Sequence, residues 1–239
     1  MRIDAEKCSG CGVCLPYCPA DAISLENRKA RIDEERCLEC GNCIRSRVVK
    51  CPKGAIFEPE ENTRGPRLFR RFLSDPSVAT PTGVPGRGTE EVKTNDVTGR
   101  VRRGEIGIAI ELGRPNVGTT IAELGKVFGP LAAKGVVFEA CNPTTMLWDA
   151  EKKEIKAEMR GERVMSAIIE ASIPIEQAEE ILADIKRIAD SLDTVFSLDV
   201  ICRYDEDGAV PILPVLARLG MNPRMNSKVN LGMGRPLAS

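Results

Sequence analysis

Apolar and polar residues follow two different periods along the second half of the chain. Isoleucines occupy every second position within residues 105–112, which is the period of a β-strand. Residues 119–135 and 174–193 repeat apolar side chains every three or four positions, which predicts two helices. Three further apolar segments predict strands: 136–141, 164–173 and 194–204.

The order of these elements, β-α-β-β-α-β, is that of a ferredoxin-like α/β sandwich formed by residues 105–204. Between the second and third strands, residues 147–159 fit either a hairpin or a short helix. Residues 205–239 are expected to form a C-terminal extension. The fold class predicted for the chain is therefore α+β, with this sandwich as one of two domains.

Residues 58–104 are rich in proline and glycine and show little periodicity. Such a composition is typical of a linker between domains. Within it, residues 67–73 combine three arginines with two phenylalanines and two leucines. We expect either a short amphipathic turn that packs on one of the domains or an element that docks a partner or an anionic ligand.

Eight of the ten cysteines lie in the first 51 residues, in two copies of one motif. The first copy, C-x2-C-x2-C-x3-C-P, uses Cys8, Cys11, Cys14 and Cys18. The second copy, C-x2-C-x2-C-x7-C-P, uses Cys37, Cys40, Cys43 and Cys51. Zinc sites usually take C-x2-C pairs separated by a longer loop, so this spacing points away from zinc.

The start of the chain carries charges at residues 2, 4, 6 and 7 in place of the apolar core of a secretory signal. No apolar run approaches the roughly 18 residues of a membrane helix. We therefore expect a cytoplasmic protein without a membrane partner, in which reduced cysteine clusters bind metal rather than form disulfides. The formal net charge of −1 gives no reason to expect a nucleic-acid partner.

The sequence has no histidine, which excludes histidine-ligated haem, Rieske centres and histidine-based triads. No side chain has an unperturbed pKa near neutrality. The composition thus favours an electron carrier over a self-contained enzyme, and no catalytic residue is predicted.

The doubled motif resembles that of the bacterial-type two-cluster ferredoxins over about the first 57 residues. The repeat extends beyond the cysteines, since "IDAEKC" is echoed by "IDEERC" and "CPADAI" by "CPKGAI". The resemblance implies two [4Fe–4S] clusters in a domain of residues 1–57, with crossed ligation. One cluster would be held by Cys8, Cys11, Cys14 and Cys51, and the other by Cys37, Cys40, Cys43 and Cys18.

The second motif departs from the family pattern, with "IRSRVVK" (44–50) where three residues are usual. Arg45, Arg47 and Lys50 place positive charge beside Cys51, so we expect the insertion to lie over the cluster that Cys51 binds. It could be a solvated surface loop. Alternatively, it docks an acidic partner or acts electrostatically on the potential of one cluster.

The segment "GRPNVGTTIAELGKVFGPLAAKGV" (113–136) is similar to the strand-to-helix turn of ACT domains, which bind amino acids and similar ligands there. The resemblance implies that the turn could offer an anionic ligand the groups of Gly113, Arg114, Asn116, Gly118, Thr119 and Thr120. A plain capped helix start explains the same residues. The whole chain also resembles the iron–sulfur module of 6-hydroxynicotinate reductase-type enzymes.

Together these features predict an iron–sulfur protein or subunit that delivers low-potential electrons to a partner reductase in anaerobic metabolism. The resemblances leave two alternatives open: a reductase with its own substrate or flavin site, and a redox-linked regulator that binds a small ligand through the ACT-like domain. Whether the chain forms a homo-oligomer is also left open.

Overall fold

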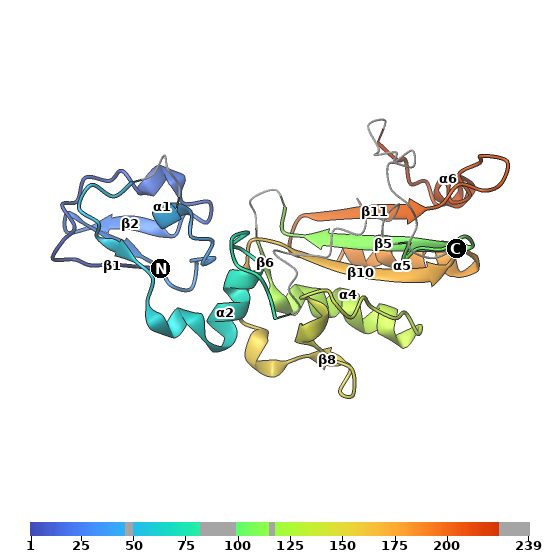
Figure 1. The fold of residues 1–239 in the computed structure, drawn as a ribbon, viewed down its shortest axis with the longest axis horizontal. Coiled ribbons are helices and arrows are strands. Elements are labelled where there is room, and N and C mark those ends of the chain that lie inside the picture. Colours follow the sequence, from blue (N-terminus) through green and yellow to red (C-terminus); the bar gives the residue numbers. More distant parts are fainter. Residues whose placement is uncertain (46–49, 82–98, 115–117, 225–239) are drawn as a thin grey trace.

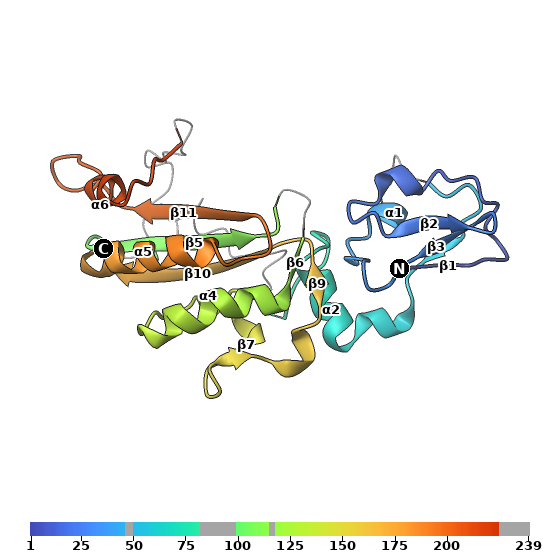
Figure 2. The same ribbon diagram turned by 180° about the vertical axis from the view of Figure 1, so that it is seen from behind.

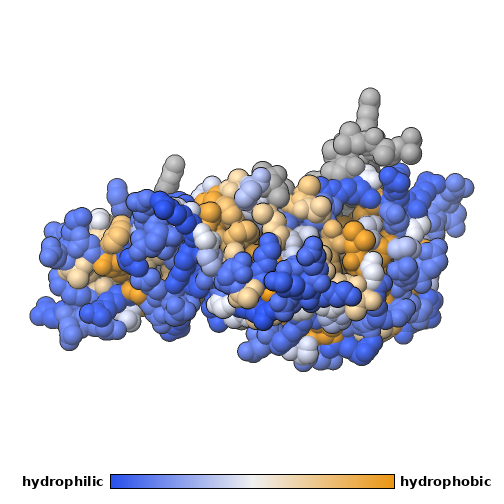
Figure 3. Space-filling view, turned by 90° about the horizontal axis from the view of Figure 1, so that it is seen from below, coloured by the Kyte–Doolittle hydropathy of each residue, from blue (hydrophilic) through white to orange (hydrophobic). Residues whose placement is uncertain are grey.

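The computed structural model describes residues 1–45, 50–81, 99–114 and 118–224. Two lobes lie side by side, joined by helix α2 (Gly65–Phe72) (Figure 1). We call residues 1–57 the N-terminal lobe, and residues 99–114 and 118–224 the C-terminal lobe. Among the described residues, no helix is long and apolar enough to cross a membrane. On the face seen from below, the outer parts of both lobes are largely hydrophilic, and apolar residues gather toward the middle (Figure 3).

The described residues of the N-terminal lobe form short elements: β1 (Arg2–Ile3), η1 (Leu15–Tyr17), β2 (Ile23–Glu26), β3 (Lys29–Ile32), α1 (Asn42–Arg45) and β4 (Ile56–Phe57). Its two antiparallel ladders are equivalent in the repeat, because Ile3 pairs with Ile56 and Ile23 pairs with Ile32. Its buried apolar residues form two small clusters in which cysteine, alanine and isoleucine predominate. So small a core leaves much of the stability of the lobe to whatever its cysteines bind.

The C-terminal lobe is built on an antiparallel sheet with β5 (Glu105–Leu112) at its centre. Strands β10 (Ala167–Pro174) and β11 (Phe196–Cys202) flank it. Every second residue of β5, from Ile106 to Leu112, is at most 2% exposed, so the predicted strand period marks the core face. Helices α4 (Ile121–Ala133) and α5 (Ala178–Ala189) contact each other and bury apolar side chains in the same core (Figures 1 and 2).

One predicted strand is wrong. Residues 136–141 form no strand, and only Phe138 makes a β-bridge, to Ala171 of β10. The reason lies in the residues that follow, whose side chains, rather than a continuous row of backbone hydrogen bonds, contact the edge of β10. Asn142 Nδ2 and Thr144 Oγ1 each donate to the carbonyl of Ile168, at 2.9 Å. The predicted four-stranded sandwich is thus a three-stranded sheet with one bridging residue at the edge of β10.

The remaining elements surround this sheet. The hairpin alternative for residues 147–159 is confirmed, because β7 (Trp148–Asp149) pairs with β8 (Glu154–Ile155). A second short ladder joins β6 (Thr119–Thr120) to β9 (Arg163–Val164). The other elements are η3 (Thr145–Leu147), η4 (Ala157–Met159), η5 (Ile175–Gln177) and α6 (Leu213–Arg218).

The segment with linker composition contains packed structure in its first part, formed by η2 (Glu60–Thr63) and α2. Leu73, which follows α2, is fully buried among the core residues of the C-terminal lobe, and Phe69 packs against the same core. This agrees with an amphipathic element at residues 67–73 that packs on a domain. Residues 82–98 of the segment lie outside the described residues.

Candidate metal centre

The eight motif cysteines surround two open cavities in the N-terminal lobe. Site 1 is lined by Cys8, Cys11, Cys14 and Cys51. Site 2 is lined by Cys18, Cys37, Cys40 and Cys43. Each site takes three cysteines from one motif and the fourth from the other, which is the grouping that crossed ligation requires.

Glycines give the two cysteine loops their tight turns. We call residues 8–14 loop A and residues 37–43 loop B. Gly10 and Gly41 have φ values of 71° and 69°, in the left-handed region that side chains disfavour. A Cβ at Gly10 would also clash with the carbonyl of Arg28, and one at Gly41 with the guanidinium of Arg45. Loop A therefore needs glycine at position 10, where a backbone carbonyl leaves no room for a Cβ, whereas the equivalent position of loop B is Glu39, with a φ of 55°.

Backbone N–H groups donate to the cysteine sulfurs. Four residues after each crossing cysteine, Ala22 N donates to Cys18 Sγ at 3.2 Å and Ala55 N to Cys51 Sγ at 3.3 Å. In loop A, Cys8 Sγ accepts from the N–H groups of Gly10 and Ala30, both at 3.4 Å. Such bonds stabilise negative charge on sulfur and act on the potential of a bound cluster.

Burial sets the protonation of the site 2 thiols. It raises the pKa of Cys43 to about 12, with the neighbouring Cys37 and Cys40 as further causes. Burial also raises the pKa of both neighbours. At Cys51, burial acts in the same direction, but the N–H groups of residues 53–56 outweigh it, so this pKa lies below its ordinary value. Metal binding at site 2 therefore has to displace protons.

The donor sets have the composition of iron–sulfur cluster sites. Each site presents four cysteines around an open cavity. Iron–sulfur clusters are held by four cysteine thiolates in this way.

The surroundings of site 2 include a buried arginine that the motif did not reveal. Arg70 of α2 is 1% exposed, and its Nη1 donates to the carbonyls of Cys37, at 2.7 Å, and Glu34, at 3.0 Å. Its Nε donates to the carboxylate of Glu162 in the C-terminal lobe at 2.5 Å. Arg70 thus joins loop B to the second lobe through one side chain.

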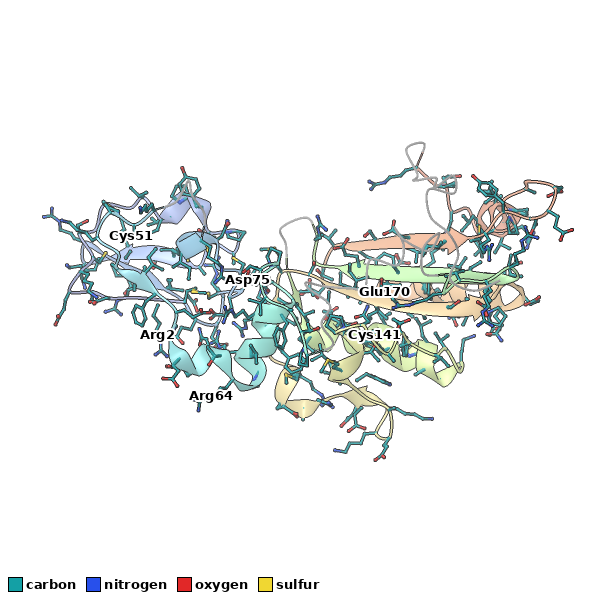
Figure 4. All side chains as sticks on the ribbon, in the orientation of Figure 1. Arg2, Cys51, Arg64, Asp75, Cys141 and Glu170 are labelled. Carbon is teal, nitrogen blue, oxygen red and sulfur yellow. The ribbon has the colours of Figure 1, made fainter. Side chains whose placement is uncertain are left out.

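The inserted segment after Cys43 also reaches the junction of the lobes. Arg45 forms an ion pair with Asp75, which is 2% exposed and follows α2. Asp75 lies between the lobes, whereas Cys51 lies on the part of the N-terminal lobe away from the second one (Figure 4). The Arg45 guanidinium is thus held by Asp75, and the expectation that the insertion covers the cluster bound by Cys51 stays a prediction, since residues 46–49 lie outside the described residues. Lys50 is exposed beside Cys51, and Arg47 lies outside the described residues.

In the turn compared above with ACT domains, several hydrogen-bond donors have partners within the chain. The N–H groups of Gly113 and Gly118 donate to the carbonyls of Val195 and Gly113, both at 2.9 Å. Thr119 Oγ1 donates to Thr120 O, and Arg114 pairs with Glu111 at 3.5 Å. Asn116 lies outside the described residues. Thr120 makes no side-chain cap, and the first N–H groups of α4, those of Ile121 and Ala122, donate to the carbonyls of Glu162 and Arg160.

The comparisons with known proteins concern the N-terminal lobe. Residues 1–52 match the family model of the 4Fe-4S dicluster domain. No curated protein and no solved structure matches the chain. The match and the two four-cysteine sites support iron–sulfur cluster binding, and a domain of this class indicates electron transfer.

Proposed function

We propose that the chain is an electron-transfer protein, or an electron-transfer subunit, that passes low-potential electrons to a partner reductase through two [4Fe–4S] clusters. The observation that carries this proposal is the division of the eight motif cysteines between two four-cysteine sites. Site 1 would hold one cluster and site 2 the other. Each cluster supplies a one-electron donor and acceptor.

The chain's own residues provide what such a cluster needs. Cysteines anchor it, backbone N–H groups stabilise charge on sulfur, and apolar side chains such as Ile3 and Ile32 line the sites. Among the described lining residues there is no lysine, aspartate or glutamate that could exchange protons with a substrate. The sites are thus suited to electron transfer rather than to acid–base chemistry.

Dithionite titration of the anaerobically isolated protein tests this function. The visible absorbance of the clusters should bleach with about two electrons per chain, one for each cluster. Electron paramagnetic resonance of the reduced protein should then show two interacting centres. A chain that takes up no electrons, or that carries zinc, would overturn the proposal.

Variants of the crossing cysteines test the ligand assignment. Cys18→Ser should impair site 2 more than site 1, although Cys18 belongs to the first motif, and Cys51→Ser should do the reverse. Cys141→Ser is the matched control, since Cys141 is exposed and lies outside both sites. Loss of the cluster nearest in sequence would show that ligation is not crossed.

We propose that the C-terminal lobe confers specificity for the partner. The two alternatives, a reductase with its own substrate or flavin site and a ligand-binding regulator, predict a flavin or small molecule bound to this lobe. Mass spectrometry of the protein isolated anaerobically distinguishes them, because a stoichiometric bound molecule would favour either alternative over a carrier.

A further inference from the structure

The two cysteine loops are equivalent in the repeat but differ in their exposure. In loop A, Ser9 and Cys11 are exposed and Gly10 is half-buried. In loop B, the residues equivalent to Ser9 and Gly10 are Leu38 and Glu39, which are 3% and 1% exposed. One cysteine loop therefore faces outward while its counterpart is covered.

Sequence differences between the repeats explain which loop is covered. Glu39 forms an ion pair with the amine of Met1 at 2.6 Å and accepts a longer hydrogen bond from Arg67 of α2, at 3.4 Å, whereas Gly10 has no side chain to offer there. Leu38 packs against the C-terminal lobe, where a Cβ at Gly118 would contact its Cδ2 at 3.7 Å. An acidic and an apolar residue thus fix loop B under α2 and the second lobe, and loop A carries neither.

Site 1 has apolar side chains at its open side. Val13 lines the site and is 43% exposed. Leu25, which is 45% exposed, lies beside Gly12, where a Cβ would contact its Cδ1 at 3.7 Å. Exposed apolar side chains around a redox centre give a partner a place to exclude water.

Basic residues flank site 1. Lys29 Nζ donates to the carbonyl of Cys8 at 2.5 Å, and the exposed Arg28 has its backbone carbonyl against Gly10 of loop A. Lys50 and Lys53, on either side of Cys51, are also exposed. The nearby Glu26 is paired with Arg31 at 3.3 Å. We name Val13, Leu25, Arg28, Lys50 and Lys53 the open face.

We propose that the open face docks an acidic redox protein. Electrons would enter or leave the chain through the cluster of site 1, and the cluster of site 2 would exchange electrons on the side of the C-terminal lobe. The proposal rests on the proposed electron-transfer function. One electron passes between the partner's redox centre and the cluster of site 1, with no proton or bond exchanged. Positive charge at the rim accelerates encounter with an acidic partner, and this acceleration falls with ionic strength.

The charge of the open face can be tested with small oxidants before the partner is known. The test variant is Arg28→Gln with Lys50→Gln and Lys53→Gln. The control removes three exposed lysines near the β7–β8 hairpin, as Lys152→Gln with Lys153→Gln and Lys156→Gln. Both variants lose the same charge, and none of the six residues lines either site.

Each reduced protein is mixed anaerobically with the anion tris(oxalato)cobaltate(III) or the cation hexaamminecobalt(III) in a stopped-flow instrument. At low salt the open-face variant should react roughly tenfold more slowly with the anion and faster with the cation, and both differences should vanish at high salt. The control should match the native protein. An acidic flavodoxin, used as a protein probe, should give the same ranking as the anion.

Equal rates for the open-face and control variants would overturn the inference, as would a change of the same sign with both cobalt complexes. A slow reaction with the flavodoxin that is insensitive to the open-face charges would also count against it. A protein that binds no cluster, or cannot be reduced before mixing, would instead contradict the proposed function, so the two failures are distinguishable.

Discussion

Replacing Arg70 tests the coupling between site 2 and the C-terminal lobe. Arg70→Gln leaves the carboxylate of Glu162, 15% exposed, without its guanidinium partner. Removing one partner of a buried ion pair typically costs about 3–5 kcal/mol. We expect about 3 kcal/mol here, because the glutamine amide can still donate to one of the carbonyls that Arg70 serves.

The same change removes a positive charge close to Cys37, and this should lower the reduction potential of one cluster. If the charge lies about 8 Å from the cluster in an effective dielectric constant of about 20, Coulomb's law gives about 2 kcal/mol, or about 90 mV for one electron. This is an upper value, since solvent and neighbouring charges screen part of it. Glu162→Gln removes the opposing charge and should raise the same potential.

Potentiometric titration followed by electron paramagnetic resonance measures the two shifts of reduction potential. The site 2 cluster should shift downward in Arg70→Gln and upward in Glu162→Gln, while the site 1 cluster stays within experimental error. Arg70→Lys keeps the charge and should retain most of the native potential. Equal shifts of both clusters, or a downward shift in Glu162→Gln, would refute the electrostatic reasoning.

Two further predictions concern the C-terminal lobe. Leu73→Ala should destabilise the C-terminal lobe by about 2–5 kcal/mol, because Leu73 is fully buried in its core. Denaturant titration followed by the fluorescence of Trp148 measures this loss of stability. Leu25→Ala, at an exposed position of the N-terminal lobe, is the control. The side-chain hydrogen bond from Arg218 holds the pKa of Glu179 below its ordinary value, so their interaction should stabilise the lobe above about pH 4.3 and be lost as the pH falls through the lowered pKa. Carbon NMR of the carboxylates should show that pKa returning to normal in Arg218→Gln, and an unchanged pKa in this variant would contradict the pairing.

The features that local sequence determines could be predicted. Cysteine spacing and the repeat indicate two metal sites, because three ligands of each site follow one another within seven residues. Alternating isoleucines predicted β5, since every second residue of a strand faces the core. Residues 136–141 have the same apolar character but lack a strand, because the edge of β10 accepts side-chain hydrogen bonds from Asn142 and Thr144 instead.

The junction of the lobes could not be predicted, because its contacts join residues far apart in the chain. Arg70 and Glu162 are separated by 92 positions, and nothing in either local pattern identifies the other. The arginines of residues 67–73 indicated an amphipathic element but not which of them would be buried. The difference between the repeats, where Leu38 and Glu39 replace Ser9 and Gly10, was a sign that loop B packs against another part of the chain. Which part it packs against could be recognised only from the position of α2 in the structure.

The central claim is that eight cysteines hold two [4Fe–4S] clusters, and its most direct test is native mass spectrometry of the protein purified without oxygen, with iron and acid-labile sulfide determined on the same sample. The account predicts a single species whose mass exceeds that of the bare chain by two cubane clusters, with about eight irons and eight sulfides per chain. Four irons per chain in a fully loaded sample, or zinc in place of iron, would contradict it.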